Sequence, residues 1–272
     1  MTLRVALVQL DAGSDVDANI ERATALADEA AAAGARLVAL PEYLHFRGPD
    51  AGFRASARPV PGPHTDPFAA VARRRDAWIL VGSTAESSGD PQRPHNTSTL
   101  IAPDGTITAT YRKIHLFDVS VDDGPVDTES DRVTPGEGPV IADVDGVPVG
   151  LSICYDLRFP ELYRALALGG AKVLTVPANF MERTGRDHWE VLLRARAIEN
   201  GAYVLAPSQV NGPPGSPAYG RSTIVDPWGT VVAQAPDVVG IIRADIDTDR
   251  VAAVRRQIPS LANRRPASYR LG

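Results

Sequence analysis

The stretch 147-VPVGLSIC-154 is an apolar run that ends at the single cysteine of the chain. The turn-prone residues 155-YDLRFP-160 follow at once, and Pro160 suits the first turn of a helix. This order predicts a strand that delivers Cys154 to its C-terminal tip just before a helix, where α/β proteins place reactive groups. A lone cysteine can also be a small buried apolar residue, so the neighbours of the thiol must decide between catalysis and packing.

Segments on either side of this strand recur in the same order. The matching pairs are 34-GARLVALP-41 with 170-GAKVLTVP-177, 77-AWIL-80 with 202-AYVL-205, 98-STLIAPDGT-106 with 222-STIVDPWGT-230 and, more weakly, 5-VALV-8 with 149-VGLS-152. Each half therefore runs strand, helix, strand, helix, strand, turn, strand. The repeat predicts a single domain over residues 1–272, in which two equivalent sheets with helices on their outer faces stack as a four-layer α-β-β-α sandwich.

Apolar residues at helical spacing predict helices over residues 17–33, 160–168 and 188–200, each followed by a glycine. The first eight residues predict a strand and not a signal peptide. The Pro- and Gly-rich stretches 58–67 and 211–220 predict loops. Residues from 255 to 272 include few apolar side chains, and we expect an arm that lies on the domain or across a dimer partner.

Composition excludes several classes of protein. The chain has 272 residues, of which 44% are hydrophobic, which is ample for a core. A net charge of −5 with scattered basic residues leaves no electrostatic footprint for nucleic acid. No apolar run reaches the roughly 18 residues that span a membrane. One cysteine excludes an internal disulfide, and a free thiol predicts the reducing cytoplasm.

Two charged residues follow apolar runs, as Cys154 does. Glu42 comes after the strand-like run 37–41, and burial at a sheet edge would make it a better base near neutrality. Lys113 follows the strand-like stretch 106–111 and could donate to an oxyanion or stabilise a thiolate. A solvated loop glutamate and a surface lysine remain the alternatives when each residue is considered alone.

Together, these motifs resemble the nitrilase superfamily of carbon–nitrogen hydrolases. The resemblance spans nearly the whole chain, and no one motif decides it. It rests on 40-LPE-42, 111-YRKIHLFD-118, 154-CYDLRFPE-161, 184-TG-185, 188-HWEVLLRARAIEN-200, 219-YGRS-222 and 225-VDPWG-229. It implies an α-β-β-α fold and a homodimer or larger assembly.

The resemblance also implies roles for individual residues. Glu42 corresponds to the general base, Lys113 to the cation that stabilises an oxyanion, and Cys154 to the nucleophile. Glu129 matches a second glutamate that orients the lysine or the substrate, although the preceding loop 119–127 is variable in such proteins. The backbone N–H of Tyr155 would complete the oxyanion site. Neither a metal nor an organic cofactor is implied, and the five histidines are not spaced as a ligand set.

Within the superfamily, the chain looks most like the Nit-type amidases, which convert ω-amides of α-keto acids or deaminated glutathione to an acid and ammonia through a thioester. It departs from that branch at 177-PANFM-181, 186-RD-187 and Arg221. We expect Arg158 to bind a distal carboxylate of the substrate, or else to pair with Asp156 or Glu161. Phe180 and Trp189 are candidate pocket walls or ordinary core aromatics. An N-carbamoyl amino acid hydrolase or a nitrilase with the same triad, and a non-catalytic scaffold, are the alternative functions.

Overall fold

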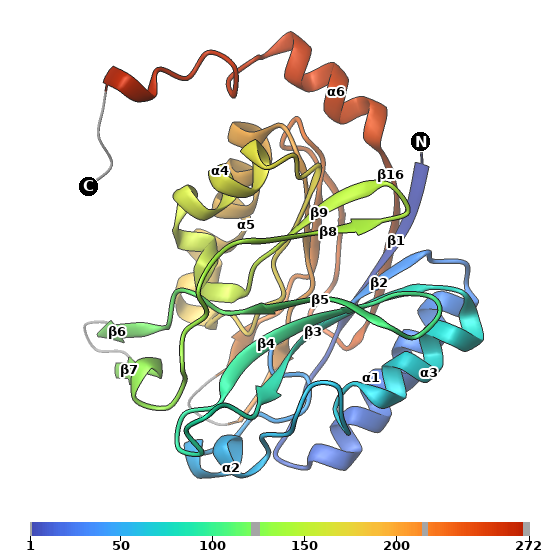
Figure 1. The fold of residues 1–272 in the computed structure, drawn as a ribbon, viewed down its shortest axis with the longest axis vertical. Helices are drawn as coiled ribbons and strands as arrows, with labels where there is room; N and C mark the ends of the chain where they lie inside the picture. Colours follow the sequence, from blue (N-terminus) through green and yellow to red (C-terminus); the bar gives the residue numbers. More distant parts are fainter. Residues whose placement is uncertain (1, 121–125, 214–216, 269–272) are drawn as a thin grey trace.

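The computed structural model describes residues 2–120, 126–213 and 217–268, and within them two six-stranded sheets face one another (Figure 1). The first sheet has the order β16 (Gly240–Asp247), β1 (Thr2–Gln9), β2 (Leu37–Ala39), β3 (Trp78–Glu86), β4 (His95–Ile101) and β5 (Ile107–Arg112). The second has the order β15 (Val231–Gln234), β14 (Thr223–Val225), β11 (Tyr203–Ala206), β10 (Val173–Thr175), β9 (Val147–Leu151) and β8 (Val140–Val144). Two short ribbons pair β6 (Asp118–Ser120) with β7 (Val126–Thr128), and β12 (Val210–Asn211) with β13 (Ala218–Tyr219).

Helices cover the outer faces of both sheets. The described residues form α1 (Val16–Ala32), α2 (Asp50–Ala55), α3 (Asp66–Arg75), α4 (Pro160–Leu168), α5 (Glu182–Asn200) and α6 (Thr248–Gln257), with 3₁₀ turns at Glu129–Asp131, Cys154–Arg158 and Pro266–Ser268. The helices α1 and α3 lie on the first sheet, and α4 and α5 lie on the second (Figure 1). The predicted four-layer α-β-β-α sandwich is confirmed.

Strand β1 shows how the sequence builds these layers. Its side chains alternate between two faces, as the period of a strand requires. Leu3, Val5 and Leu7 join the core between the sheets, whereas Ala6 and Val8 pack with the helices α1 and α3. Both faces are apolar because both are covered.

The two sheets share one pairing pattern. In the first, β1, β2 and β3 are parallel, and β4 and β5 then continue antiparallel. In the second, β9, β10 and β11 are parallel, and β14 and β15 continue antiparallel. Each sheet therefore has one strand more in this pattern than the predicted series of strand, helix, strand, helix, strand, turn and strand, because β3 and β4, like β11 and β14, are separate antiparallel strands. A pseudo-two-fold relation between the halves stays a prediction.

Helix boundaries differ from the prediction mainly at α5. This helix begins at Glu182 rather than at residue 188, because the polar residues 182–187 contain Gly185 and carry no apolar period. A Cβ at Gly185 would lie 2.5 Å from Tyr219, so this glycine allows close packing instead of ending a helix. The predicted variable loop and the loop 211–220 lie partly outside the described residues, as do positions 269–272 of the arm.

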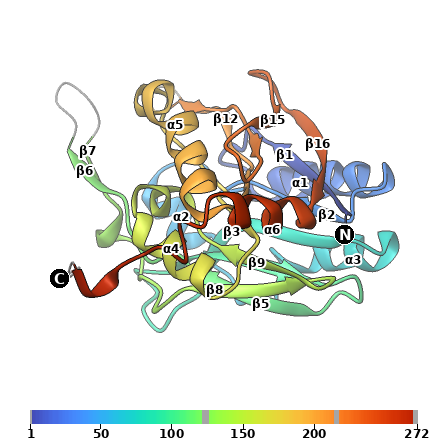
Figure 2. The same ribbon diagram turned by 90° about the horizontal axis from the view of Figure 1, so that it is seen from above.

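The C-terminal segment leaves the body of the molecule after α6 (Figure 2). Val251 and Val254 of α6 are buried, and Arg255 donates to backbone carbonyls of Ala171, Asn200 and Gly201. Residues 258–268 are largely exposed. Among the described residues, no helix combines the length and the apolar character needed to cross a membrane.

Candidate active site

Cys154 lies just beyond the end of β9, at the first residue of a tight 3₁₀ turn. Its φ angle is +47°, in the left-handed region that strains a side chain other than glycine. Its backbone N–H donates to the carbonyl of Pro177 at 2.9 Å. The turn therefore holds the thiol in a fixed position at the end of the sheet, where the cysteine is buried.

The buried carboxylate of Asp156 anchors this turn to the first sheet. Its Oδ2 accepts hydrogen bonds from the Ile153 N–H at 2.8 Å and the Tyr111 hydroxyl at 2.6 Å. Its Oδ1 contacts the backbone N–H and Nδ1 of His115 at 3.1 and 2.7 Å. The predicted alternative of an Asp156–Arg158 ion pair is therefore wrong, because other partners occupy the carboxylate.

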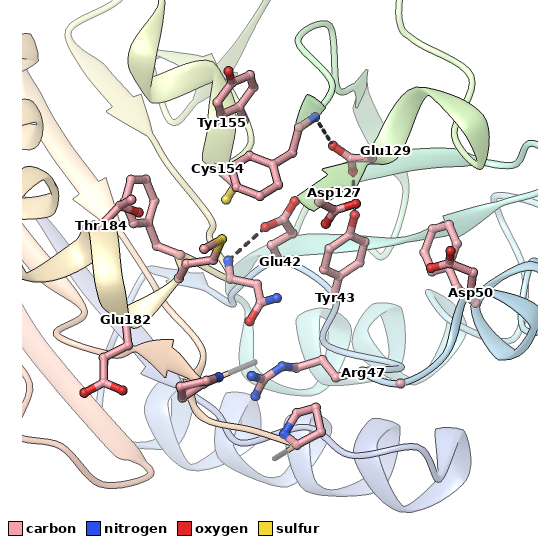
Figure 3. A pocket seen from close by; sticks show the side chains of 18 of the residues that line it. Glu42, Tyr43, Arg47, Asp50, Asp127, Glu129, Cys154, Tyr155, Glu182 and Thr184 are labelled. Atoms are coloured by element: carbon pink, nitrogen blue, oxygen red, sulfur yellow. Dashed lines mark hydrogen bonds between the residues drawn. The ribbon is translucent and has the colours of Figure 1, made fainter. Parts of the chain in front are cut away.

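Glu42, Lys113 and Glu129 come from different elements and meet beside the thiol. Glu42 follows β2, Lys113 follows β5, and Glu129 begins the 3₁₀ turn after β7. The ammonium Nζ lies 3.0 Å from Glu42 Oε1 and 2.8 Å from Glu129 Oε2, and all three side chains are at most 2% exposed. These residues and Cys154 line one cavity (Figure 3). The structure thus brings together all four residues predicted as catalytic.

Burial and charge determine the resting protonation of the thiol and the ammonium. Burial raises the pKa of Cys154 well above its usual range, and the Glu42 carboxylate raises it further, against the opposing effect of Lys113. Burial alone would lower the pKa of Lys113, but Glu129 and Glu42 outweigh it and hold this pKa well above its usual range. The resting site therefore holds a neutral thiol and an ammonium.

Glu129 is held in its ionised form. Burial would raise its pKa, but the charge of Lys113 and the hydrogen bonds to the carboxylate lower it overall. The donors include the Tyr43 hydroxyl at 2.5 Å and the Phe117 N–H at 2.6 Å. A carboxylate with so many donors is a fixed anion rather than a group that exchanges protons.

Sequence reasoning missed three groups in this network. Tyr43 donates to Glu129, the Asn179 N–H donates to Glu42 Oε2 at 2.8 Å, and Asn96 Nδ2 donates to Glu42 Oε1 at 2.9 Å. Tyr43 also has a positive φ of 53° directly after Glu42. None stands in a pattern typical of catalysis, although Asn96 lies on β4, the neighbour of the strand that leads to Lys113.

The cavity beside the thiol has a volume of about 940 Å³, and Tyr155, Arg158 and Phe180 line it as expected. Trp189 does not line it. It is buried behind Phe180, with ring centroids 5.0 Å apart, and its Nε1 donates to the carbonyl of Arg221 at 2.9 Å. Trp189 therefore supports the wall of the pocket, which corrects its prediction as a substrate-binding residue.

Arg158 presents a guanidinium without a carboxylate partner. Within the described part of the chain, no carboxylate lies within ion-pairing distance of it, and neither predicted alternative pair forms. Its Nη1 contacts His188 Nδ1 at 3.2 Å, and its guanidinium carbon lies 5.2 Å from the Phe180 ring centroid and 5.9 Å from that of Tyr155. Aromatic rings and an imidazole do not neutralise the guanidinium as a carboxylate would, so its charge is available to an anion.

The departures from the Nit pattern divide into two groups. Asn179, Met181 and Arg186 line the cavity, whereas Arg221 lies outside its lining and pairs with Asp237 at 2.8 Å. Across residues 2–120, 126–213 and 217–268, no group of three or more His, Cys, Asp or Glu side chains is arranged to hold a metal ion.

The fold and the site together define a class of protein: an α-β-β-α sandwich in which a buried glutamate, lysine and cysteine meet at the ends of the strands. Residues 4–256 match the carbon–nitrogen hydrolase family, and the chain belongs to this family. It is a hydrolase that acts on carbon–nitrogen bonds.

Several known proteins resemble the chain over nearly its whole length. The deaminated glutathione amidase of Synechocystis sp. is 42% identical over 263 residues, which cover 95% of this chain and 97% of the relative. The omega-amidase of Homo sapiens is 38% identical over 269 residues, covering 98% and 97%. The crystal structure of the C. elegans NitFhit protein has a TM-score of 0.93 and 34% identity, and the match covers 99% of this chain and 66% of that longer one.

Proposed function

We propose that this protein is an amidase that hydrolyses a small carboxylic amide to an acid and ammonia. The observation that carries the proposal is the convergence of Cys154, Glu42 and Lys113 in one cavity, with the lysine 3.0 Å from the glutamate. Glu42 acts as the general base, Lys113 as the oxyanion donor and Cys154 as the nucleophile. Glu129, which contacts Lys113 at 2.8 Å, orients the ammonium.

Acylation begins with a neutral thiol, because the pKa of Cys154 is raised by its burial and by Glu42. Glu42 takes the thiol proton as the sulfur attacks the amide carbonyl carbon, and the carbonyl electrons move onto oxygen. Glu42 gives its proton to the nitrogen as the tetrahedral intermediate collapses and the carbon–nitrogen bond breaks. Ammonia departs, and a thioester remains.

The developing oxyanion needs donors that are already in place. Lys113 supplies a buried ammonium, and Tyr155 supplies a backbone N–H near the start of its 3₁₀ turn, where helical geometry leaves no partner. Each such donor contributes about 3–4 kcal/mol to lowering the barrier. Because Lys113 is only 2% exposed, its ammonium need not be desolvated during the reaction.

Deacylation repeats the same proton path. Glu42 takes a proton from a water molecule as the water oxygen attacks the thioester carbonyl. The sulfur leaves when the carbon–sulfur bond breaks. The thiolate recovers a proton from Glu42, and the carboxylic acid departs. The cycle needs no metal and no organic cofactor.

We propose that the substrate carries a carboxylate distal to its amide, as ω-amides of α-keto acids and deaminated glutathione do. Arg158 supports this assignment, because its guanidinium lines the cavity without an anionic partner among the described residues. The aromatic rings of Tyr155 and Phe180 lie beside it. Relatives named deaminated glutathione amidase and omega-amidase agree with an acidic amide.

Ammonia release from the wild type and Cys154→Ala tests the reaction across α-ketoglutaramate, deaminated glutathione, asparagine, a carbamoyl amino acid and a simple nitrile. Turnover of the acidic amides that disappears in Cys154→Ala supports the proposal. Activity confined to the carbamoyl compound or the nitrile would retain the triad and refute the amidase assignment. Equal activity in both proteins would refute the role of the thiol.

We further propose one hydrolase domain over residues 1–272 with an arm from about residue 255, a homodimeric or larger assembly, and a cytoplasmic location. An apolar patch on α5 and the neighbouring turn supports association, because Val191, Ile198 and Trp228 are 66%, 51% and 48% exposed. Cys154 carries a free thiol, which a reducing compartment preserves.

A further inference from the structure

Asn96, the second residue of β4, contacts both carboxylates of the site and the backbone of Lys113. Its Nδ2 lies 2.9 Å from Glu42 Oε1 and 3.4 Å from Glu129 Oε1. Its backbone carbonyl accepts the N–H of Lys113 at 2.9 Å. The residue is completely buried, so water does not substitute for these contacts. One side chain therefore bridges the two carboxylates, and its backbone fixes the residue that neutralises them.

The orientation of the Asn96 amide follows from charge. Only the donor end can face two carboxylates, because the Oδ1 end would be repelled by both. Oδ1 consequently points away and has no hydrogen-bond partner in the described part of the chain. An unsatisfied buried carbonyl destabilises a fold, and a leucine of similar size would avoid that loss. The packing of the strand alone therefore does not account for an amide at this position.

The two carboxylate oxygens of Glu42 have different numbers of hydrogen-bond donors. Lys113 and Asn96 both bind Oε1, so the lone pairs of that oxygen are occupied. Oε2 accepts only the backbone N–H of Asn179 among the described hydrogen bonds. The carboxylate is thus held in one rotamer, with Oε2 open to accept a proton.

We propose that Asn96 is a positioning residue of the hydrolytic reaction, which bridges Glu42 and Glu129 and leaves Glu42 Oε2 as the oxygen that exchanges the proton with Cys154. The inference rests on the proposed function, because it requires Glu42 to be the base. Without the bridge, Lys113 is the only group that still donates to Glu42 Oε1, and it is the only group that still donates to both carboxylates. The repulsion between the two carboxylates is then less well compensated. Proton transfer then occurs from a looser and less favourable geometry.

Asn96→Leu tests the bridge, because it removes the donor and nearly keeps the volume. We expect kcat for the amide substrate to fall about 10- to 100-fold and KM to change less than about twofold. Loss of a hydrogen-bond donor disfavours the ionised form of a carboxylate, so the acidic limb of the kcat/KM profile should move to higher pH. Thr99→Val is the matched control: Thr99 is completely buried on the same strand, its hydroxyl has no partner in the described structure, and its kinetics should stay unchanged.

Alkylation of Cys154 by iodoacetamide gives a readout that needs no amide substrate. We expect its rate-against-pH profile to move to higher pH in Asn96→Leu and to stay in place in Thr99→Val. Glu42→Gln distinguishes a failure of the proposed function from a failure of the role proposed for Asn96. An alkylation profile unchanged in Glu42→Gln would contradict the base itself, and hence the proposed function. A profile altered in Glu42→Gln but not in Asn96→Leu would overturn only the inference.

Thermal unfolding and circular dichroism establish that each variant is folded before its kinetics are compared. If Asn96→Leu does not fold, Asn96→Ser is the substitute, because serine keeps a donor on a shorter side chain. Its pH profile should move in the same direction as that expected for Asn96→Leu, but by less. A folded variant that has lost only thermal stability, with kcat and both pH profiles of the wild type, would show that Asn96 is merely structural and would refute the proposal.

Discussion

Lys113→Met removes the ammonium that two buried carboxylates share. Its Nζ lies 3.0 Å from Glu42 and 2.8 Å from Glu129, and all three side chains are at most 2% exposed. Removing one partner of a buried ion pair destabilises a protein by about 3–5 kcal/mol, because a charge is left unpaired. At roughly 2–4 °C per kcal/mol, the melting temperature should fall on the order of 10 °C. If Lys113 is the oxyanion donor of the proposed reaction, its loss should lower kcat by about 10²- to 10³-fold.

The same substitution should invert the contribution of Glu129 to the pH dependence of stability. In the wild type, Lys113 and hydrogen bonds lower the pKa of Glu129 from 4.5, so its stabilisation is present above pH 4.5 and is lost as the pH falls below it. Without Lys113, burial is opposed only by the remaining donors, and the folded-state pKa should rise above the unfolded value. The folded state then binds the extra proton, and stability is lost as the pH increases from about 5 to 8.

Thermal unfolding at pH 5 and pH 8 measures both effects, with ammonia release as the activity assay. Lys113→Met/Glu129→Gln provides the decisive comparison, because it removes one negative charge together with the positive one. We expect this double variant to regain about 2–3 kcal/mol of the lost stability but not the lost kcat. The reasoning is refuted if Lys113→Met keeps the pH dependence of the wild type, or if Glu129→Gln adds its own loss to that of Lys113→Met.

Three further predictions test other parts of the site and surface. Arg158→Lys should raise KM about 10-fold or more for acidic amides but not for neutral ones, because it loses bidentate binding of a carboxylate; equal losses in steady-state kinetics would contradict that role. Tyr43→Phe removes a donor to an ionised carboxylate and should destabilise the protein by about 1.5–3 kcal/mol in denaturant unfolding. Tyr163→Phe, which removes a hydroxyl contact to neutral Ser152, should lose only about 1 kcal/mol, and an equal loss in both would argue against the ionised Glu129. Val191→Asp places a charge on the exposed patch of α5 and should shift the protein toward monomers in sedimentation velocity, whereas an unchanged assembly would show that this patch is not the interface.

The residues that follow apolar strands could be found from the sequence. Glu42 and Cys154 each come three residues after the end of a buried parallel strand, and Lys113 directly follows β5. The strands β2 and β5 belong to the first sheet and β9 belongs to the second. Because the two sheets stack, the residues that follow these strands line one cavity, at strand ends where α/β proteins place reactive groups. The resemblance to a known family then assigned a role to each of these residues, which, taken separately, had ordinary alternatives.

The residues that hold this set could not be found in the same way. Asn96 lies inside a strand of polar residues, and nothing in its local pattern distinguishes it from Thr97 or Thr99. Its role depends on contacts to Glu42 and Glu129, which are 54 and 33 residues away in the chain. Local periodicity reports which face of an element is buried, but it does not report which distant groups meet there. Similarly, the side chain of Trp189 is of a type that often lines pockets, but its position in the fold is that of a buried core residue.

The balance of charge in the site explains why its thiol is not ionised at rest. A cysteine beside a histidine or a helix N-terminus is activated by a lowered pKa, whereas here two carboxylates accompany one ammonium, and the pKa of Cys154 is raised by burial and by Glu42. A free thiolate would add a third negative charge to a buried site with one positive group. In the proposed reaction, the negative charge leaves Glu42 as it forms on sulfur, passes to the oxyanion, and returns to Glu42 when ammonia departs. The total charge therefore stays constant, so a fixed set of donors from Lys113, Asn96 and the backbone suits every step without rearrangement.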